Sequence, residues 1–230
     1  PGVDASRVGV WGISQGGWIG PLAASLDPGV AFVINTSGPA TSLRRQDSYM
    51  MGNTLRARGF TADEIALVMR GLDVLYDYGR GKATAEALDA AMDQARAHPK
   101  LREIALPPAA QLSPAALYAK QQIGDPAWFF HLDPDNDAIG PYRRLRCPVL
   151  VTYGRLDYTV PVEESAGLLR ALAPAPGYRN PTIFISPDSG HGYLRMQDAN
   201  PMLPVSPTGI SRDLFRGIDA WLDAQRLARR

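Results

Sequence analysis

The sequence has a single cysteine, three histidines and no long apolar run. One cysteine excludes an internal disulfide, and no Cys/His cluster has the spacing of a metal site. A spanning helix needs a stretch of about 18 apolar residues, so we expect no membrane span. Lysine and arginine (24) barely outnumber aspartate and glutamate (23), and no basic stripe indicates a nucleic-acid-binding face. We therefore expect neither a nucleic-acid partner nor a bound metal.

The pattern Gly-x-Ser-x-Gly occurs early in the chain, at residues 12–16. An apolar run typical of a strand, 7–11, precedes it, and a segment typical of a helix, 15–26, follows. This is the context in which the pattern holds a nucleophilic serine, here Ser14. We expect both glycines to be required, since a side chain at either position would collide with the neighbouring strand or helix. The helix would also point free backbone N–H groups at the place where an oxyanion forms.

A serine nucleophile needs a histidine base and a carboxylate, which follow it in the chain in this arrangement. His191 is the best of the three histidines, because it lies on a glycine-flanked loop directly after a strand-like run, 181–185. His98 ends an alanine-rich helical pattern, and His131 lies in an aromatic segment before a turn. We interpret those two as structural residues.

Asp157 is the best candidate for the carboxylate. It lies three residues beyond the end of a buried-strand pattern, 147–154, and so at the same edge of a parallel sheet as the serine. Three aspartates between 133 and 137 precede that strand, and we interpret them as turn residues. The candidates therefore occur in the chain order serine, aspartate, histidine.

The motif at 12–16, the strand and loop at 148–161 and the Ser-Gly-His-Gly loop at 189–192 together resemble the α/β-hydrolase fold. Within it they resemble most the dienelactone-hydrolase and prolyl-oligopeptidase-like esterases and peptidases. The resemblance implies that Ser14 is the nucleophile, His191 the general base and acid, and Asp157 the orienting carboxylate. It also implies that the backbone N–H of Gln15 is one oxyanion donor. No cofactor is implied.

The alternation of strands and helices predicts an α/β fold with a mainly parallel sheet. Residues 1–38 and 143–230 form the predicted hydrolase core, and the predominantly helical residues 39–142 form a predicted cap inserted over the serine. The core ends in a predicted helix over 208–228. Its expected core-facing stripe consists of Ile210, Leu214, Ile218, Trp221 and Leu222.

The cap is expected to contain at least three helices. A capping box at 61–64 begins the first, periodic apolar residues from 85 to 95 mark the second, and Ser113 with Pro114 begins the third. Aromatic residues are the candidates for a substrate pocket. They are Trp18, Trp128, Phe129 and Phe130.

The family pattern places several strands before the serine, and this sequence has none there. In such enzymes a loop after an early strand supplies the second oxyanion donor. We therefore expect the sequence to be the C-terminal part of an α/β-hydrolase fold. The alternative is a degenerate chain with another function.

The sequence thus predicts a serine hydrolase that cleaves a carboxylic ester through an acyl-enzyme. A peptidase of oligopeptidase or aminopeptidase type is an alternative, because the same groups cleave both bonds. Asp63 and Glu64 are a possible carboxylate pair for a substrate amine, although the capping box explains them better. A degenerate, non-catalytic hydrolase-fold binding module is a second alternative. The expected partner is a small ester or a short peptide.

Overall fold

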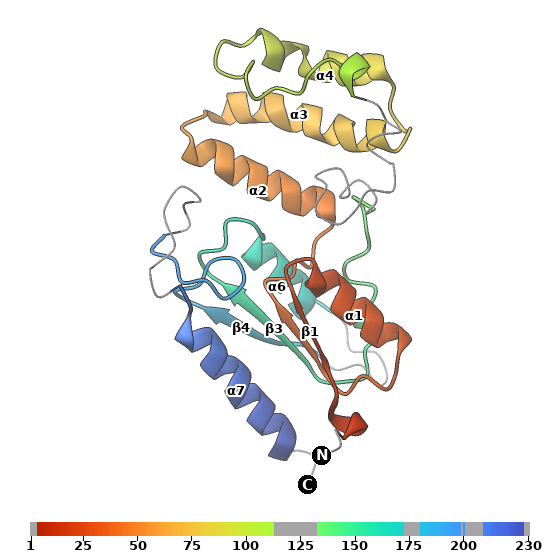
Figure 1. Cartoon of the computed structure of the whole chain (residues 1–230), viewed down its shortest axis with the longest axis vertical. Coiled ribbons are helices and arrows are strands. Elements are labelled where there is room, and N and C mark those ends of the chain that lie inside the picture. The colour runs from red at the N-terminus through yellow and green to blue at the C-terminus, as the bar shows by residue number, and fades with distance from the viewer. Residues whose placement is uncertain (1–3, 113–132, 173–179, 199, 201–208, 228–230) are drawn as a thin grey trace. The chain divides into compact units, whose positions relative to one another are not determined.

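The computed structural model describes residues 4–112, 133–172, 180–198, 200 and 209–227. The chain divides into two compact units, one made of Pro1–Ser42 with Asp137–Arg230 and the other of Leu43–Asn136. We call the first the sheet unit and the second the helical unit (Figure 1). The predicted domain boundaries, and the predicted placement of a cap over the serine, stay predictions.

Four strands form one sheet in the described part of the sheet unit. They lie in the order β1 (Val10–Ile13), β2 (Val33–Thr36), β3 (Val149–Gly154) and β4 (Thr182–Ser186). Each neighbouring pair is parallel, and Thr36 lies beside Ile13 on one side and Thr152 on the other. The predicted α/β class with a mainly parallel sheet is therefore confirmed. Since all four strands run the same way, their carboxyl ends meet at one edge of the sheet.

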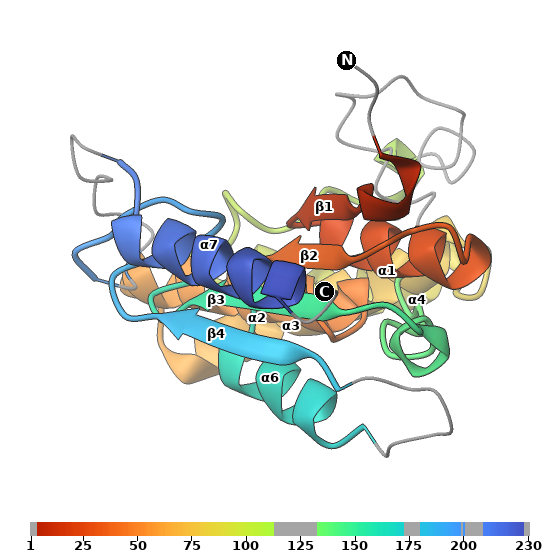
Figure 2. The ribbon, with the colours of Figure 1, turned by 90° about the horizontal axis from the view of Figure 1, so that it is seen from below.

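Helices cover both faces of this sheet (Figure 2). On one face, α1 (Gly16–Leu26) and α6 (Val162–Arg170) contribute Ala24 and Leu169 to a core with strand residues such as Val151. On the other face, α7 (Arg212–Leu227) packs against β2 and β3. Coverage of both faces explains why β2 and β3 are buried along their whole length.

The last helix begins later than the sequence pattern predicts. Ile210 precedes it, pairs with Leu194 in an antiparallel bridge and is 49% exposed, so its predicted place in the core-facing stripe is wrong. The reason is Ser211, whose hydroxyl accepts a hydrogen bond from the Leu214 N–H at 3.4 Å and caps the helix after Ile210. The other four predicted residues do pack against the sheet. They are Leu214, Ile218, Trp221 and Leu222.

The helical unit contains α2 (Leu43–Ala57), α3 (Ala62–Gly79), α4 (Ala85–Ala97) and the short 3₁₀-helix η2 (Ala109–Gln111). The predicted capping box is present, because the Thr61 N–H donates to Glu64 at 2.7 Å and the Glu64 N–H donates to the Thr61 hydroxyl at 3.3 Å. The predicted helix that begins at Ser113 lies outside the described residues.

Two more 3₁₀-helices, η1 (Ala5–Arg7) and η4 (Tyr142–Arg144), belong to the sheet unit. Among the described residues, no helix is both long enough and apolar enough to cross a membrane.

Candidate active site

Ser14 lies in the tight turn between β1 and α1. Its φ of 55° is left-handed, a conformation that costs about 1–3 kcal/mol in a residue with a side chain. A hydrogen bond of 2.9 Å from its N–H to the Thr36 carbonyl ties this turn to β2. Gly12 must lack a side chain, because a Cβ there would lie 2.1 Å from the Gly16 carbonyl oxygen. The strand, turn and helix that the motif predicts are therefore all present.

The second steric requirement falls on Gly17 instead of Gly16. A Cβ at Gly16 would meet no described atom within 4 Å, so the predicted need for glycine there is wrong. A Cβ at Gly17 would lie 2.2 Å from the Gly38 Cα and 2.5 Å from the Asn35 Oδ1. The close approach is thus between α1 and the chain after β2, a contact between segments that the motif alone does not locate.

His191 lies on the loop after β4, within hydrogen-bond distance of both expected partners. Its Nε2 is 2.9 Å from the Ser14 Oγ, and its Nδ1 is 3.0 Å from the Asp157 Oδ2. The side chain of His191 is 26% exposed, whereas that of Asp157 is completely buried. The three side chains that the sequence singled out therefore come together, with the imidazole in the middle and open to solvent.

Asp157 is held by its own loop in one orientation. Its Oδ1 accepts hydrogen bonds from the backbone N–H groups of Thr159 at 2.8 Å and Val160 at 3.0 Å. These bonds leave Oδ2 to face His191. The Leu156 N–H also donates to the Ser189 carbonyl at 2.8 Å, which joins the loop after β3 to the loop that carries His191.

Gln15 precedes the first turn of α1, next to Ser14. Its backbone N–H has no hydrogen-bond partner among the described residues. At a helix N-terminus such an N–H carries part of the positive end of the helix dipole, which favours a nearby anion. The role of this N–H as an oxyanion donor, which the family resemblance implies, stays a prediction.

Asp188 anchors the histidine loop, and its role is one that the sequence pattern did not suggest. Its Oδ1 accepts hydrogen bonds from the hydroxyls of Ser211 at 2.7 Å and Ser186 at 3.0 Å. The bond from Ser211, followed by that from Ser186, lowers the pKa of Asp188. Both serines look like ordinary polar residues in the sequence, so only its place three residues before His191 could have drawn attention to Asp188.

The remaining sequence candidates are not joined to this site by any contact described. The Trp18 indole N–H donates to the Thr41 carbonyl at 3.1 Å, so its pocket role stays a prediction. His98 ends α4, and its Nε2 lies 3.8 Å from a Glu64 oxygen. The other aromatic pocket candidates and the third histidine lie outside the described residues. They are Trp128, Phe129, Phe130 and His131.

The three aspartates before β3, predicted to be turn residues, are held by ion pairs or by turn hydrogen bonds. Asp133 pairs with Arg80 at 3.1 Å, and Asp135 pairs with Arg44 at 2.7 Å. The Asp137 carboxylate accepts the Gly140 N–H at 2.8 Å in a turn. None of these carboxylates has a described contact with His191, which leaves Asp157 as its partner.

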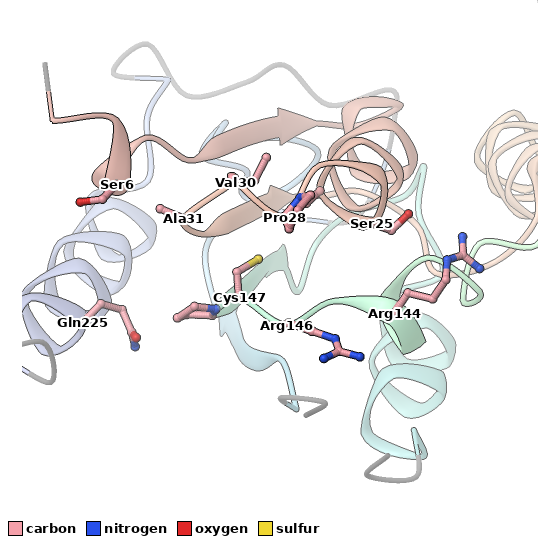
Figure 3. A pocket seen from close by; sticks show the side chains of 12 residues that line it. Ser6, Ser25, Pro28, Val30, Ala31, Arg144, Arg146, Cys147 and Gln225 are labelled. Atoms are coloured by element: carbon pink, nitrogen blue, oxygen red, sulfur yellow. The ribbon is translucent and has the colours of Figure 1, made fainter. Parts of the chain in front are cut away.

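A cavity of about 720 Å³ lies at the opposite edge of the sheet, before the amino ends of β2 and β3 (Figure 3). It does not include Ser14, Asp157 or His191. Its lining consists of Ser6, Ala24, Ser25, Pro28, Gly29, Val30, Ala31, Arg144, Arg146, Cys147, Pro148 and Gln225. In the described part of the chain, no group of three histidine, cysteine or acidic side chains is arranged to hold a metal ion.

No model of a known protein family matches the sequence, and no curated protein matches it either. Solved structures similar to this chain include an esterase from Pyrococcus furiosus, at 13% identity and a TM-score of 0.40. A bacterial membrane phospholipase A is similar at 18% identity and a TM-score of 0.41. An acylaminoacyl peptidase from Pyrococcus horikoshii is similar at 14% identity and a TM-score of 0.37.

These similarities extend over 81%, 96% and 83% of this chain, but over only 46%, 58% and 21% of the three proteins, respectively. The chain thus spans between about a fifth and three fifths of their length. All three are hydrolases by name.

Proposed function

We propose that this chain is a serine hydrolase of the α/β-hydrolase fold that cleaves a small or medium-sized carboxylic ester through an acyl-enzyme. In this proposal Ser14 is the nucleophile, His191 transfers the proton and Asp157 orients His191. The observation that carries it is the hydrogen-bond relay from the Ser14 Oγ to His191 at 2.9 Å and from His191 to Asp157 at 3.0 Å. The relay joins side chains 177 and 34 residues apart, and each follows a different strand of the sheet.

Acylation begins when the Ser14 Oγ attacks the ester carbonyl carbon. Because the Asp157 carboxylate accepts the Nδ1–H of His191, the neutral ring presents its lone pair at Nε2, where it takes the serine proton. The carbonyl oxygen becomes an oxyanion and accepts the free N–H of Gln15. As the tetrahedral intermediate collapses, the imidazolium gives its proton to the leaving alcohol, and the acyl group remains on Ser14.

Deacylation uses the same groups with water in place of the alcohol. His191 removes a proton from water, and the resulting hydroxide attacks the acyl carbonyl. The second tetrahedral intermediate expels the Ser14 oxygen, which recovers its proton from Nε2, and the carboxylic acid leaves. Partial exposure of His191 supports this step, since water can reach the imidazole.

Peptide hydrolysis remains the alternative, because the same three side chains serve an amide bond. The possible amine-binding pair loses support, since the Glu64 carboxylate bonds to the Thr61 N–H at 2.7 Å and pairs with Lys100 at 3.4 Å. A non-catalytic binding module would not require the nucleophile, base and carboxylate to lie in a continuous relay. We therefore place ester hydrolysis first.

The test is covalent labelling of the full-length protein with a fluorophosphonate, followed by peptide mass spectrometry. We expect the label on Ser14, and Ser14→Ala should not be labelled. The same substitution should lower turnover of a short aryl ester by about 10³-fold or more. Ser25→Ala is the matched control, because Ser25 lies on α1, the helix that follows Ser14, and its hydroxyl donates to the Leu22 carbonyl at 2.8 Å. Labelling that persisted in Ser14→Ala would refute the assignment. Parallel assays with aryl esters and aminoacyl anilides would separate esterase from peptidase.

A further inference from the structure

Ser37 occupies the same position after β2 that Ser14 occupies after β1. In the described part of the chain these two serines are the non-glycine residues with positive φ, 51° at Ser37 and 55° at Ser14. The preceding residues, Ile13 and Thr36, are direct register partners in the sheet. Ser37 is completely buried, and the proposed mechanism gives it no role.

Among the described residues, the Ser37 hydroxyl has hydrogen-bond contacts with the backbone of Gly192. It accepts a hydrogen bond from the Gly192 N–H at 2.9 Å, and its oxygen lies 3.3 Å from the Gly192 carbonyl oxygen, to which it can donate. A hydroxyl can do both at once, because it carries one donor and two acceptor lone pairs. Gly192 directly follows His191 and is itself left-handed, with φ of 72°.

The histidine loop is therefore fixed on both sides of His191. Before the histidine, the Asp188 carboxylate holds two serine hydroxyls and the Gly190 N–H donates to the Leu194 carbonyl at 2.8 Å. After it, the Gly192 N–H donates to the hydroxyl of Ser37, the first residue beyond β2. A shift of the backbone at Gly192 would move the imidazole away from partners that lie at 2.9 and 3.0 Å.

We propose that Ser37 is a positioning residue, whose hydroxyl fixes the backbone at Gly192 and thereby keeps the His191 Nε2 within reach of Ser14. This inference rests on the function proposed above. Ser37 is itself held in place, because its N–H donates to the Thr152 carbonyl at 2.8 Å. The left-handed turn thus links the central strands of the sheet to the loop of the base.

The experiment compares Ser37→Ala and Ser37→Gly with Ser165→Ala in the full-length protein. Ser165 is also completely buried, and its hydroxyl accepts a backbone N–H, that of Ala40 at 3.2 Å, away from the histidine loop. Both Ser37 variants should lower kcat and the rate of Ser14 labelling by about 10- to 100-fold with KM unchanged, since a small misplacement of a catalytic group has effects of that size. Ser165→Ala should lower the melting temperature without this loss of rate.

Proton NMR of the His191 Nδ1–H provides a readout that does not depend on turnover. We expect the hydrogen-bonded signal to broaden or disappear in both Ser37 variants and to persist in Ser165→Ala. Labelling at the wild-type rate in either Ser37 variant would overturn the proposal. A wild-type labelling rate in Ser37→Gly would show that the hydroxyl is dispensable. Failure of both variants to fold would make Ser37 a folding residue and overturn it as well. If wild-type Ser14 is not labelled, the proposed function fails, and the NMR comparison still tests the contact.

Discussion

Replacing Asp157 with asparagine should keep the fold and remove most of the activity. The carboxylate accepts the Thr159 and Val160 N–H groups on one oxygen and faces the His191 Nδ1 with the other. An asparagine must turn its own oxygen toward the two N–H groups, because its amide nitrogen cannot accept from them. The amide NH₂ then faces Nδ1 at about the 3.0 Å of the present contact.

That orientation reverses the tautomer of the imidazole. Nδ1 becomes the acceptor, the ring proton moves to Nε2, and Nε2 can no longer take the proton of Ser14. For this change in a serine–histidine–aspartate relay we expect kcat to fall by about 10⁴-fold. Converted at about 1.36 kcal/mol per factor of ten, the loss is about 5.4 kcal/mol of transition-state stabilisation.

The assay is kcat on a short aryl ester, with thermal unfolding followed by circular dichroism to confirm that the variant is folded. Asp137→Asn is the matched control, since the Asp137 Oδ1 also accepts two turn N–H groups, those of Ile139 and Gly140, without any described contact to His191. It should retain wild-type turnover. Full activity in folded Asp157→Asn would refute the reasoning and require another carboxylate to orient the base.

Four further substitutions test the packing and the loop. Urea unfolding should show that Gly12→Ala lowers the free energy of unfolding by about 3 kcal/mol or more, because the new Cβ overlaps the backbone. Gly16→Ala, in open space within a helix, should be neutral or raise it by up to about 1 kcal/mol; equal losses at the two glycines would contradict the geometry. The pKa of Asp188 is lowered in the folded state, so ionised Asp188 stabilises the fold. This stabilisation of the fold is fully present above the unfolded-state pKa of about 3.9 and is lost as the pH falls through the folded-state pKa. Melting temperatures measured from pH 6 to pH 2 should therefore fall less steeply in Asp188→Asn than in the wild type, and parallel curves would argue against this role. Leu214→Ala, at a fully buried site, should lower the free energy of unfolding by about 2–5 kcal/mol in the same urea assay, and a change below 1 kcal/mol would contradict that burial.

Much of the candidate site was predictable because its signals are local. A serine between two glycines, after an apolar run and before a helical segment, needs only a few neighbouring residues to define its turn. Asp157 and His191 each follow a strand pattern, and parallel strands bring their carboxyl ends to one edge whatever the length of chain between them. The α/β class follows from the same alternation of strands and helices.

The tertiary structure decided what depends on contacts between distant segments. Gly17, not Gly16, meets Gly38, because the approach of α1 to the chain after β2 depends on how the helix packs on the sheet. Ile210 fits the helical period of the segment after it, but the Ser211 cap starts the helix beyond it. The hydrogen bond between Ser37 and Gly192 joins residues that are 155 apart in the sequence. No sequence pattern distinguishes Ser37 from the other serines. Periodicity reports which face of an element is buried, whereas the partner of a buried polar group is known only once the elements are packed.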